Sequence, residues 1–584
     1  MSRFKLGFAA MLLTAIASVA PLAHATPVLK VMIVGASGSW QALGVGAYRG
    51  GNCPNNVAGA CAHYSNGSFT LTDTRPTSKG GANVTDTGAI WIVWDKTVND
   101  PTCNACDVWA YIKVDSIVGN RCYFARPHCT VSVTSFPAPV SQISLPAPAW
   151  GPETTPPASI QALFTTGTKT NVAASEIRPE DALFGQCRIN SDVGGAHDGL
   201  DGLGLSPGHN ATGTCPAFGA TLAQLEGTDL TSDFPGSTST AHPMAFSISG
   251  HDPFTNTAIP AYSQAVVGAS PLVFITARQN ELANVTNASL ADLQAAFSGA
   301  NCNANNFTGG TNAPIDVYLR EPLSGTMNTA EYTTFRLPLG SGGNYGGVSQ
   351  ETGLTGLTKA SSVPCTVGGV RRSGIGTGEE VKFILNSNTA TLDNRDGIGY
   401  AFFSYGNVSS IAGSANFGYL TVDGIDPIWQ LYGTTYDPGQ SSIAGALPKT
   451  SDLPSGCVGG AGAFPCAESV IWKGALSYPH VRDGSYRQWC VIRLISDGTS
   501  FTNAQALIAS TQASVVNTVP DFIPAAATGS DPGLKLFRSH YTQQGVAPAN
   551  NPTDKGGEEG GCIVPITSKA TKLVQRNTGC AQGN

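Results

Sequence analysis

Apolar runs that end in small polar turns recur through the N-terminal third of the chain. Residues 28–40, VLKVMIVGASGSW, form such a run and close on a Gly/Ser turn. This pattern predicts a buried strand with a turn at its carboxyl end, as at the start of an α/β domain. Further strands are predicted at 89–95 (AIWIVWD) and within 108–119 (VWAYIKVDSIVG), the second with a turn at Asp115-Ser116.

The pattern changes to a helical period between residues 286 and 299, TNASLADLQAAFSG. Leucine and phenylalanine recur there at helical spacing, which predicts an amphipathic helix. Asn287 or Ser289 precedes the apolar positions as the N-cap, and Gly299 ends the segment.

Strands and helices alternate between residues 264 and 408. Strand-like runs at 264–278 and 397–408 flank a strand–turn–helix pattern at 315–335 and a Gly-rich turn with a short helix at 374–387. This alternation predicts an α/β fold with a mostly parallel sheet between helices.

The amino-acid composition indicates an exported, loop-rich protein. Only 12% of the 584 residues are charged, whereas Gly (69) and Pro (37) are abundant. This length has room for two to four domains of roughly 100–200 residues each. The net charge of −7 argues against a nucleic-acid-binding surface.

The composition of residues 190–241 predicts a long excursion from the core. Within it, GGAHDGLDGLGLSPGH is predicted to be a solvated loop, because it lacks the acidic spacing of a calcium site.

Residues 1–25 have the parts of a secretory signal peptide. Two basic residues precede an apolar stretch, and an A-x-A cleavage site lies just before Thr26. The stretch is short for a membrane span, and no later segment is long and apolar enough to be one. We therefore expect a periplasmic or secreted protein with no membrane span in the mature chain.

The 15 cysteines are expected to form disulfides, because exported proteins meet an oxidising environment. The odd count leaves at least one unpaired. Cys103 and Cys106 have redox or zinc spacing, but no second such pair accompanies them, which favours a structural bridge to each other or to distant partners. Close spacings predict short bridged loops at Cys53/Cys61, Cys122/Cys129 and Cys457/Cys466.

The segment 317–326, VYLREPLSGT, combines one cation with two hydroxyls around a glycine. Arg320 ends a strand-like run, and its guanidinium fork can bind two oxygens of one anion. Ser324, Gly325 and Thr326 precede a predicted helix, whose first amides add donors. A surface arginine beside an N-capping serine is the alternative interpretation.

Three other turns place polar side chains after predicted strands. A hydroxyl and bare amides where a helix begins suit an anion. The turns are GASGSW with Ser39 and Trp40, VDSIVGNR with Ser116, and ASEIRPED with Ser175, Glu176 and Arg178.

In this order the motifs resemble the phosphate-binding (PstS-like) group of periplasmic binding proteins, which have a two-lobed class II α/β fold with a hinge. The resemblance runs from Val28 to about Val408, with long insertions between the motifs, and leaves most of the chain after 410 uncovered. The family's Arg-x-x-x-Ser-Gly-Thr turn is matched in full. The resemblance implies anion contacts from Ser39, Trp40, Ser116, Ser175, Glu176, Arg320, Ser324, Gly325 and Thr326.

The resemblance also implies how the chain divides. Lobe one comprises 26–265 with 405–584, lobe two comprises 266–404, and the crossings lie near 262–272 and 398–406. An inorganic oxyanion, phosphate above all, is then captured between the lobes, and an ABC permease is the implied partner. Such capture needs no catalysis, cofactor or metal, and the sequence has no GxSxG or HExxH motif.

Glu176 departs from the family pattern, which has an aspartate in this turn and a proline one residue sooner. A carboxylate accepts the proton of hydrogen phosphate and repels a fully ionised anion, so the departure leaves phosphate and sulfate both open. A surface ion pair between Glu176 and Arg178 is the alternative.

Two other function classes stay open on the sequence. The lobed core would serve an extracellular adhesion or surface-layer protein as a scaffold, with the Gly/Thr-rich insertions and the C-terminal region as its interaction surface. A secreted phosphohydrolase would need a metal cluster of Asp and His residues, which the sequence does not assemble.

Overall fold

The structure is a computed structural model, which describes only some residues of the chain. These are 26–49, 61–74, 84–95, 102–143, 150–179, 182, 226–227, 242–243, 246–248, 250–252, 254–277, 279–321, 323–335, 338–339, 344–345, 350, 362–374, 376–386, 394–404, 417–428, 478–515, 522–527, 533–534, 536–538 and 563–565.

One sheet of 15 strands runs through the described residues, in the order β15-β16-β12-β17-β10-β20-β7-β1-β4-β3-β2-β5-β6, with β18 and β21 paired to β10. Its strands are β1 (Val28–Gly35), β2 (Cys61–Asp73), β3 (Val84–Asp95), β4 (Asp107–Lys113), β5 (Thr130–Ser132), β6 (Thr168–Lys169), β7 (Val172–Ser175), β10 (Ser263–Ala277), β12 (Asp316–Arg320), β15 (Val363–Pro364), β16 (Val370–Gly374), β17 (Gly397–Phe402), β18 (Phe417–Tyr419), β20 (Trp489–Ser496) and β21 (Ile523–Pro524).

Short strand pairs and helices complete the described structure. The pairs are β8 (Glu226–Gly227) with β9 (His242–Pro243), β11 (Asn287–Ala288) with β19 (Thr421–Val422), β13 (Pro338–Leu339) with β14 (Asn344–Tyr345), and β22 (Leu536–Arg538) with β23 (Ile563–Pro565). The helices are α2 (Trp40–Arg49), α3 (Ser116–Phe124), α4 (Ala158–Thr165), α7 (Leu290–Phe297), α8 (Gly325–Ala330), α9 (Gly376–Asn386), α11 (Pro479–Asp483) and α12 (Gly498–Val515), with the 3-10 helix η5 (Ala304–Asn306) and the π-helix η6 (Glu331–Phe335).

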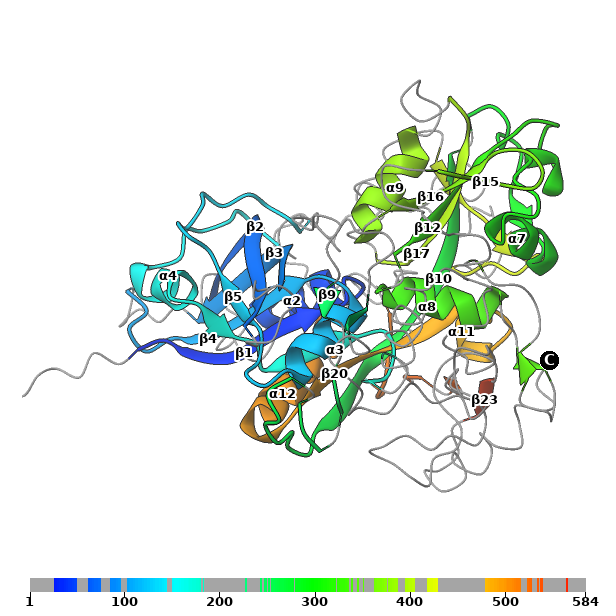
Figure 1. Cartoon of the computed structure of the whole chain (residues 1–584). Helices are drawn as coiled ribbons and strands as arrows, with labels where there is room; N and C mark the ends of the chain where they lie inside the picture. Colours follow the sequence, from blue (N-terminus) through cyan, green and yellow to red (C-terminus); the bar gives the residue numbers. More distant parts are fainter. Residues whose placement is uncertain are drawn as a thin grey trace, which may run out of the picture.

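The sheet is shared between two lobes (Figure 1). The first lobe contains β1 to β7 with α2, α3, α4 and α12, and the second contains β12 and β15 to β17 with α7, α8 and α9. Strand β10 is 15 residues long and runs from one lobe to the other. Its first part, 263–271, pairs with β20, and its second part, 272–276, pairs with β17.

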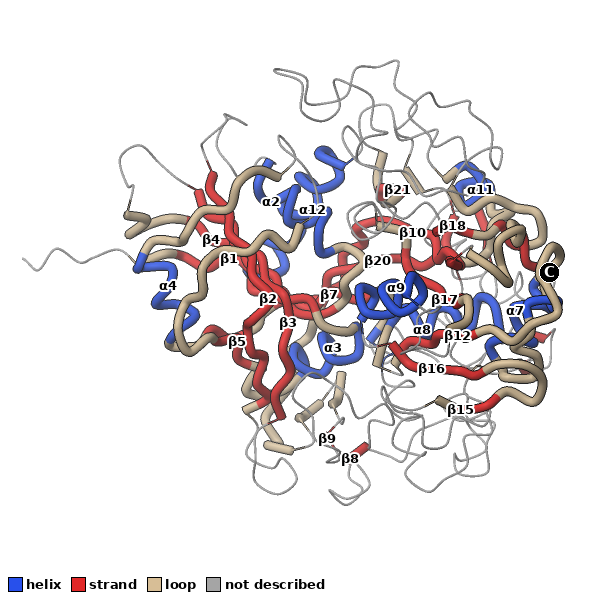
Figure 2. Tube along the Cα trace, turned by 90° about the horizontal axis from the view of Figure 1, so that it is seen from above, coloured by secondary structure: helices blue, strands red, loops and turns tan. Residues whose placement is uncertain are grey.

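Helices cover both faces of the first-lobe sheet. Successive side chains of a strand point to opposite faces, and β1 follows this rule. Val31 and Ile33 pack in the core that contains α2, whereas Met32 and Val34 pack in the core that contains α3. Helix α12 lies beside α2 (Figure 2). The carboxyl ends of the strands therefore stay free to carry polar turns.

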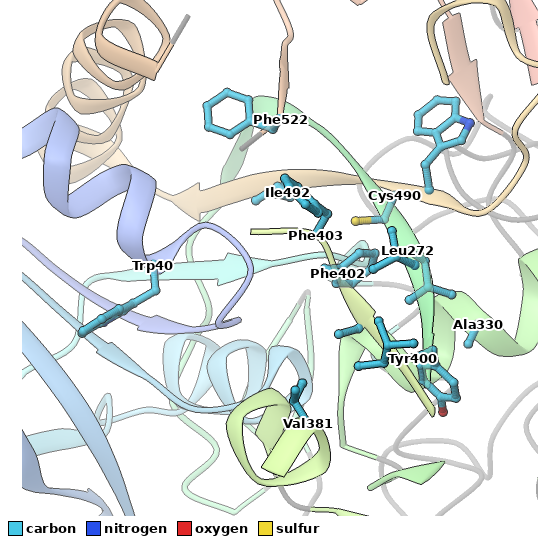
Figure 3. Packing of buried hydrophobic residues seen from close by; sticks show 14 of the residues in the cluster. Trp40, Leu272, Ala330, Val381, Tyr400, Phe402, Phe403, Cys490, Ile492 and Phe522 are labelled. Carbon is cyan, nitrogen blue, oxygen red and sulfur yellow. The ribbon is translucent and has the colours of Figure 1, made fainter. Parts of the chain in front are cut away.

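The core on the α2 side continues through the junction into the second lobe. Leu272 of β10, Phe402 of β17 and Ile492 of β20 are buried side by side in it (Figure 3). The same cluster reaches from Trp40 in the first lobe to Phe297 in the second. Apolar packing thus joins the two lobes along β10.

The predicted α/β class is confirmed, but the prediction of a mostly parallel sheet is wrong. Parallel pairing in the large sheet is confined to β7-β1-β4 and to β16-β12-β17. The other pairs are antiparallel, because the long β2–β3 hairpin and the crossing strands β10 and β20 enter the same sheet. The alternation of strands and helices therefore corresponds to parallel pairing in only two short parts of the sheet.

The predicted helix at 286–299 is confirmed with its cap. Helix α7 begins after Ser289, whose hydroxyl accepts from the Asp292 amide while the Asp292 carboxylate accepts from the Ser289 amide. This reciprocal pair is a capping box. Gly299 follows the helix with φ of +80°, a conformation that glycine adopts at low cost. Of the two predicted caps, the structure selects Ser289 over Asn287.

Disulfides form as the exported composition predicts. Cys122–Cys129 closes the predicted short loop, and the CNAC cysteines bond to each other as Cys103–Cys106. Cys302–Cys365 is an additional bridge. Cys490 of β20 is fully buried and belongs to none of these three bridges. The pair Cys457/Cys466 lies outside the described residues, as does Cys53.

Several other predictions fall outside the described part of the chain. These are the signal peptide 1–25, nearly all of the excursion 190–241, and the segment 429–477. The division of the chain into lobe one (26–265 with 405–584) and lobe two (266–404) stays a prediction. Of the strands after residue 405, β18 pairs with β10, and β19 pairs with β11. Among the described residues, no helix combines the length and apolar character that a membrane crossing requires.

Candidate functional site

Three turns of the first lobe meet because their strands are parallel neighbours. β1 pairs in parallel with β4 on one side and with β7 on the other. The carboxyl ends of parallel strands lie at one edge of a sheet, where ligands bind in α/β proteins. The turn 36–39 follows β1, Asp115-Ser116 follows β4, and Glu176 follows β7.

Glu176 links these turns to one another. Ser116 Oγ donates to Glu176 Oε2 at 2.7 Å, and the amide of Gly38 donates to Glu176 Oε1 at 3.2 Å. Glu176 is 2% exposed and Ser116 is fully buried. The carboxylate therefore occupies an anion-binding arrangement formed by a hydroxyl and an amide.

A glycine permits the close approach of β1 and β7 at this edge. Gly35 has φ of +133°, and a Cβ there would lie 2.1 Å from the carbonyl oxygen of Ala174. Any larger residue would push the two turns apart, because both the space and the backbone conformation require glycine.

The second lobe builds its part of the site in the same way. β12 and β16 are parallel, and Arg320 at the end of β12 stands opposite Gly374 at the end of β16. Ser324 caps α8 by accepting from the amides of Thr326 and Met327. Helix α9 follows β16 and places Thr377 near its start. Two helices thus begin beside the arginine, with the partial positive charge of their N-termini.

Arg320 is the centre of the site and is only 2% exposed. Its Nη1 donates to Thr377 Oγ1 at 2.9 Å and to Thr326 Oγ1 at 3.4 Å. Glu321 accepts from Nη2 at 2.8 Å and from Nε at 3.1 Å, which orients the guanidinium plane. Asp115 of the first lobe accepts from Nη2 at 3.0 Å.

The two lobes contact each other at this arginine. Besides the Asp115–Arg320 ion pair, the amide of Ile117 donates to the carbonyl of Leu323 at 3.2 Å. Gly325 lies so close to the first lobe that an added Cβ would be 2.3 Å from Ser116 Oγ and from Glu176 Oε2. We call the group Asp115, Ser116, Glu176, Arg320, Gly325, Thr326 and Thr377 the interlobe site.

Four carboxyl groups surround this one guanidinium, and their pKa values diverge. Burial, and then the charge of Glu321, raise the pKa of Asp115 well above its usual range. Burial also raises the pKa of Glu176 and, more strongly, that of Glu380, whose Oε2 lies 3.9 Å from Arg320 Nε. Burial acts on Glu321 too, but the charge of Arg320 and the hydrogen bonds from Asp115 and Arg320 together outweigh burial and lower the pKa of Glu321.

These shifts determine the charge of the interlobe site. Arg320 keeps its proton, because burial, which alone would lower its pKa, is outweighed by Glu321 and Asp115. Glu321 is the carboxylate that neutralises it, while burial raises the pKa values of Asp115, Glu176 and Glu380. A protonated carboxyl donates a hydrogen bond, so such a site tolerates an anion better than four carboxylates would.

The predicted site residues fall into two groups. Ser116, Glu176, Arg320, Gly325 and Thr326 come together in the interlobe site. The others lie next to it but are engaged locally.

Ser324 uses its hydroxyl as the cap of α8. Ser175 Oγ accepts from Asn120 Nδ2 and from the Ile177 amide, both at 3.2 Å. The amide of Trp40 donates to the Ser37 carbonyl within the turn, and Ser39 is fully buried beside it.

Sequence reasoning missed two members of the interlobe site, Asp115 and Thr377, and the two glutamates next to Arg320, Glu321 and Glu380. Asp115 directly precedes the predicted Ser116, and an acidic residue at the end of a predicted strand could have been recognised as a candidate site residue. Thr377 lies in the Gly-rich turn GIGTGEE, after a strand of the same alternation, and Glu321 directly follows Arg320. Glu380 gave no signal, since a glutamate on a short helix is usually exposed.

The two surface alternatives are wrong. Arg320 is buried at 2% exposure and has partners from both lobes. Glu176 and Arg178 are 2% and 4% exposed, so they do not form a surface ion pair. Burial of these charges within a polar set implies a specific role for the set.

Solved phosphate-binding proteins match the fold of this chain at low sequence identity. A putative phosphate ABC transporter substrate-binding protein from Clostridium perfringens, with bound phosphate, is 16% identical over 44% of this chain and 67% of its own, with a TM-score of 0.25. An ABC-type phosphate transport receptor from Vibrio cholerae is 12% identical over 45% and 71%, with a TM-score of 0.22. A high-affinity periplasmic phosphate-binding protein, PfluDING, bound with phosphate, is 12% identical over 85% and 90%, with a TM-score of 0.32.

No protein-family model and no curated protein gives a significant match to this chain. The TM-scores above are low, so the interpretation of the interlobe site rests on its own geometry.

Proposed function

We propose that this chain is an exported solute-binding protein that captures an inorganic oxyanion between its two lobes, with phosphate as the favoured ligand. The observation that supports this most is the buried guanidinium of Arg320 at the point where both lobes meet. Arginine presents a planar fork of donors that matches tetrahedral oxyanions.

Donors from both lobes surround this cation. Thr326 and Thr377 of the second lobe contact Nη1 of Arg320, and Ser116 of the first lobe lies against Gly325. Helices α3, α8 and α9 begin among these residues, so the partial positive charge at their N-termini favours an anion. An anion that contacts both lobes favours the closed state, because only that state offers all the donors.

The acidic residues favour an oxyanion that carries a proton. Glu176 already accepts from Ser116 and Gly38, and it is the side chain of the first lobe that lies against Gly325. A carboxylate there accepts the proton of hydrogen phosphate, whereas sulfate has no proton to donate. Phosphate over sulfate is therefore the proposed preference.

Among the described residues, no group of three or more His, Cys, Asp or Glu side chains is arranged to hold a metal ion. The adhesion alternative depends largely on the excursion 190–241, nearly all of which lies outside the described residues. Delivery to an ABC permease belongs to the proposal as the implied next step.

Calorimetric titration of the mature chain with phosphate, arsenate and sulfate tests the function. We expect phosphate and arsenate to bind with a Kd of about 1 μM or tighter, which corresponds to roughly −8 kcal/mol, and sulfate to bind more weakly. Arg320→Ala removes the central fork and should abolish binding, and Arg320→Lys should weaken it because an ammonium lacks the fork.

Arg395→Ala is the matched control. Arg395 is 30% exposed and its Nη1 lies 3.8 Å from Asp316, away from the interlobe site, so binding should persist. Absence of binding to any of the three anions by the folded wild-type protein would rule the function out, and turnover of a phosphate ester would indicate an enzyme instead.

A further inference from the structure

Arg320 Nη2 donates to two carboxylates that come from opposite lobes. Glu321 Oε1 accepts at 2.8 Å and Asp115 Oδ1 accepts at 3.0 Å. Glu321 also accepts from Nε and directly follows the arginine in the chain, so it travels with the guanidinium when the lobes move. Asp115 belongs to the first lobe, and its bond to Nη2 exists only when the lobes are together.

The carboxyl group of Asp115 does not serve the helix that it precedes. Asp115 is the N-cap residue of α3, with φ of −103° and ψ of 162°, but its side chain accepts no hydrogen bond from the helix. N-cap aspartates ordinarily bond to the amides one turn on. Here the side chain bonds to Arg320 instead and is 7% exposed.

The position of Asp115 conflicts with anion capture. A tetrahedral anion that uses the guanidinium fork needs both terminal nitrogens of Arg320, and Nη1 already faces the hydroxyls of Thr326 and Thr377. An ionised Asp115 holds Nη2 and places a negative charge beside the incoming anion. Like charges brought together in a desolvated site cost several kcal/mol.

We propose that Asp115 sets the affinity and the pH range of oxyanion capture, because it competes with the anion for Nη2 of Arg320. This inference rests on the proposed function and adds a competing residue to it. When the lobes are together without an anion, Asp115 bonds to the arginine, and it must release Nη2 when the anion binds.

The direction of the pH effect follows from the groups that face Asp115. These are Arg320 at the end of β12, Glu321 directly after it, and Glu176 after β7, with Glu380 of α9 on the far side of the guanidinium. Burial and Glu321 raise the pKa of Asp115, so its carboxyl remains neutral to a higher pH than usual. A neutral Asp115 releases Nη2 of Arg320 readily, whereas an ionised Asp115 does not. Affinity for the anion should therefore fall as the pH rises through this pKa.

Asp115→Asn tests the competition directly. Asparagine is also a good N-cap, so α3 should persist, and Asp115→Ser serves if the amide disturbs folding. Inorganic phosphate is titrated calorimetrically into the mature wild type and into the variant, from about pH 5.5 to about pH 8.5. The ionisation of phosphate changes both Kd values equally, so the ratio of the wild-type Kd to the variant Kd is free of that effect. We expect the ratio to lie near one at the acid end and to reach about tenfold at the alkaline end.

Asp107→Asn is the matched control, because Asp107 begins β4 in the same lobe and pairs with Lys30 at 3.0 Å on the surface. Its ratio should stay near one at every pH. A ratio for Asp115→Asn that does not rise with pH, or weaker binding by the variant throughout, overturns the competition while the proposed function stands. No phosphate binding by either protein at any pH overturns the proposed function itself.

Discussion

At the scale of single residues, the buried guanidinium of Arg320 affects the ionisation of every carboxyl group around it. Removing an ion from water costs several kcal/mol, so a buried charge needs close, well-aligned partners. Arg320 has such a partner in Glu321, which accepts from two of its nitrogens. Glu380 is also fully buried but lies 3.9 Å from Nε and makes no such pair. Its charge is the uncompensated one.

Glu380→Gln is therefore expected to stabilise the protein at neutral pH. The folded pKa of Glu380 is raised by burial, so the stability that its neutral form contributes is present at acid pH and is lost as the pH rises through that pKa. Glutamine keeps the acceptor for the Tyr400 amide and carries no charge. Chemical denaturation should give equal free energies of unfolding near pH 4 and a gain of about 1–3 kcal/mol for the variant near pH 8.

The adjacent Glu379→Gln on α9 is the control, because Glu379 is only half-buried. It should show little change at either pH. A less stable Glu380→Gln variant near pH 8 would mean that Glu380 is ionised and supports Arg320.

At the scale of elements, the strand–turn–helix unit recurs at each part of the site. β4 leads into α3, β12 into α8 and β16 into α9, and each turn carries a polar residue of the interlobe site. These units could be predicted because strand runs, caps and glycine stops are contiguous in the chain. Asp115-Ser116 was predicted as a turn within a strand-like run, whereas the structure starts α3 at Ser116. The run 117–119, Ile-Val-Gly, has strand-like composition, and tertiary packing overrode that preference.

The capping box of α7 provides a test of an element away from the site. Ser289→Ala removes the hydroxyl that accepts from the Asp292 amide and should lower the free energy of unfolding by about 1 kcal/mol. Phosphate affinity should not change, since α7 contributes no residue to the interlobe site. Ser298→Ala at the other end of the helix, where the hydroxyl donates to Ala295 at 3.3 Å, should cost less. Equal losses for the two variants would contradict the assignment of the cap.

At the scale of the whole molecule, two lobes share a core along β10 and meet again at the interlobe site. The first connection is apolar and continuous, from Trp40 to Phe297. The second is polar and includes the Asp115–Arg320 pair, the Ile117–Leu323 bond, the Ser37–Thr377 contact and the contact at Gly325. Motion between the lobes can break polar contacts while β10 and its core stay intact, which is the behaviour of a hinge.

Gly325→Ala should separate closure from folding. Gly325 begins α8, where alanine is favourable, but a Cβ would lie 2.3 Å from Ser116 Oγ and Glu176 Oε2 of the other lobe. We expect phosphate affinity to fall at least about tenfold while the unfolding temperature stays nearly the same. Calorimetric titration and thermal denaturation measure the two effects.

Gly378→Ala on α9 is the matched control, since an added Cβ there meets nothing within 4 Å. Its phosphate affinity should equal that of the wild type. Unchanged affinity in Gly325→Ala would show that the lobes need not approach this closely to bind.

The sequence by itself determined the local units of this protein: the buried strands, the capped helix α7, the disulfide of the 122–129 loop, and the polar turns that end in Ser116, Glu176 and Arg320. Each depends on residues within a short stretch, so periodicity and spacing reveal it. Only the tertiary structure decided which turns meet. Asp115 and Arg320 are 205 residues apart, and Ser37 and Thr377 are 340 apart. Such partners are chosen by strand order and by the contact of two lobes, and the mixed sheet, the competing Asp115 and the buried Glu380 follow from that long-range packing.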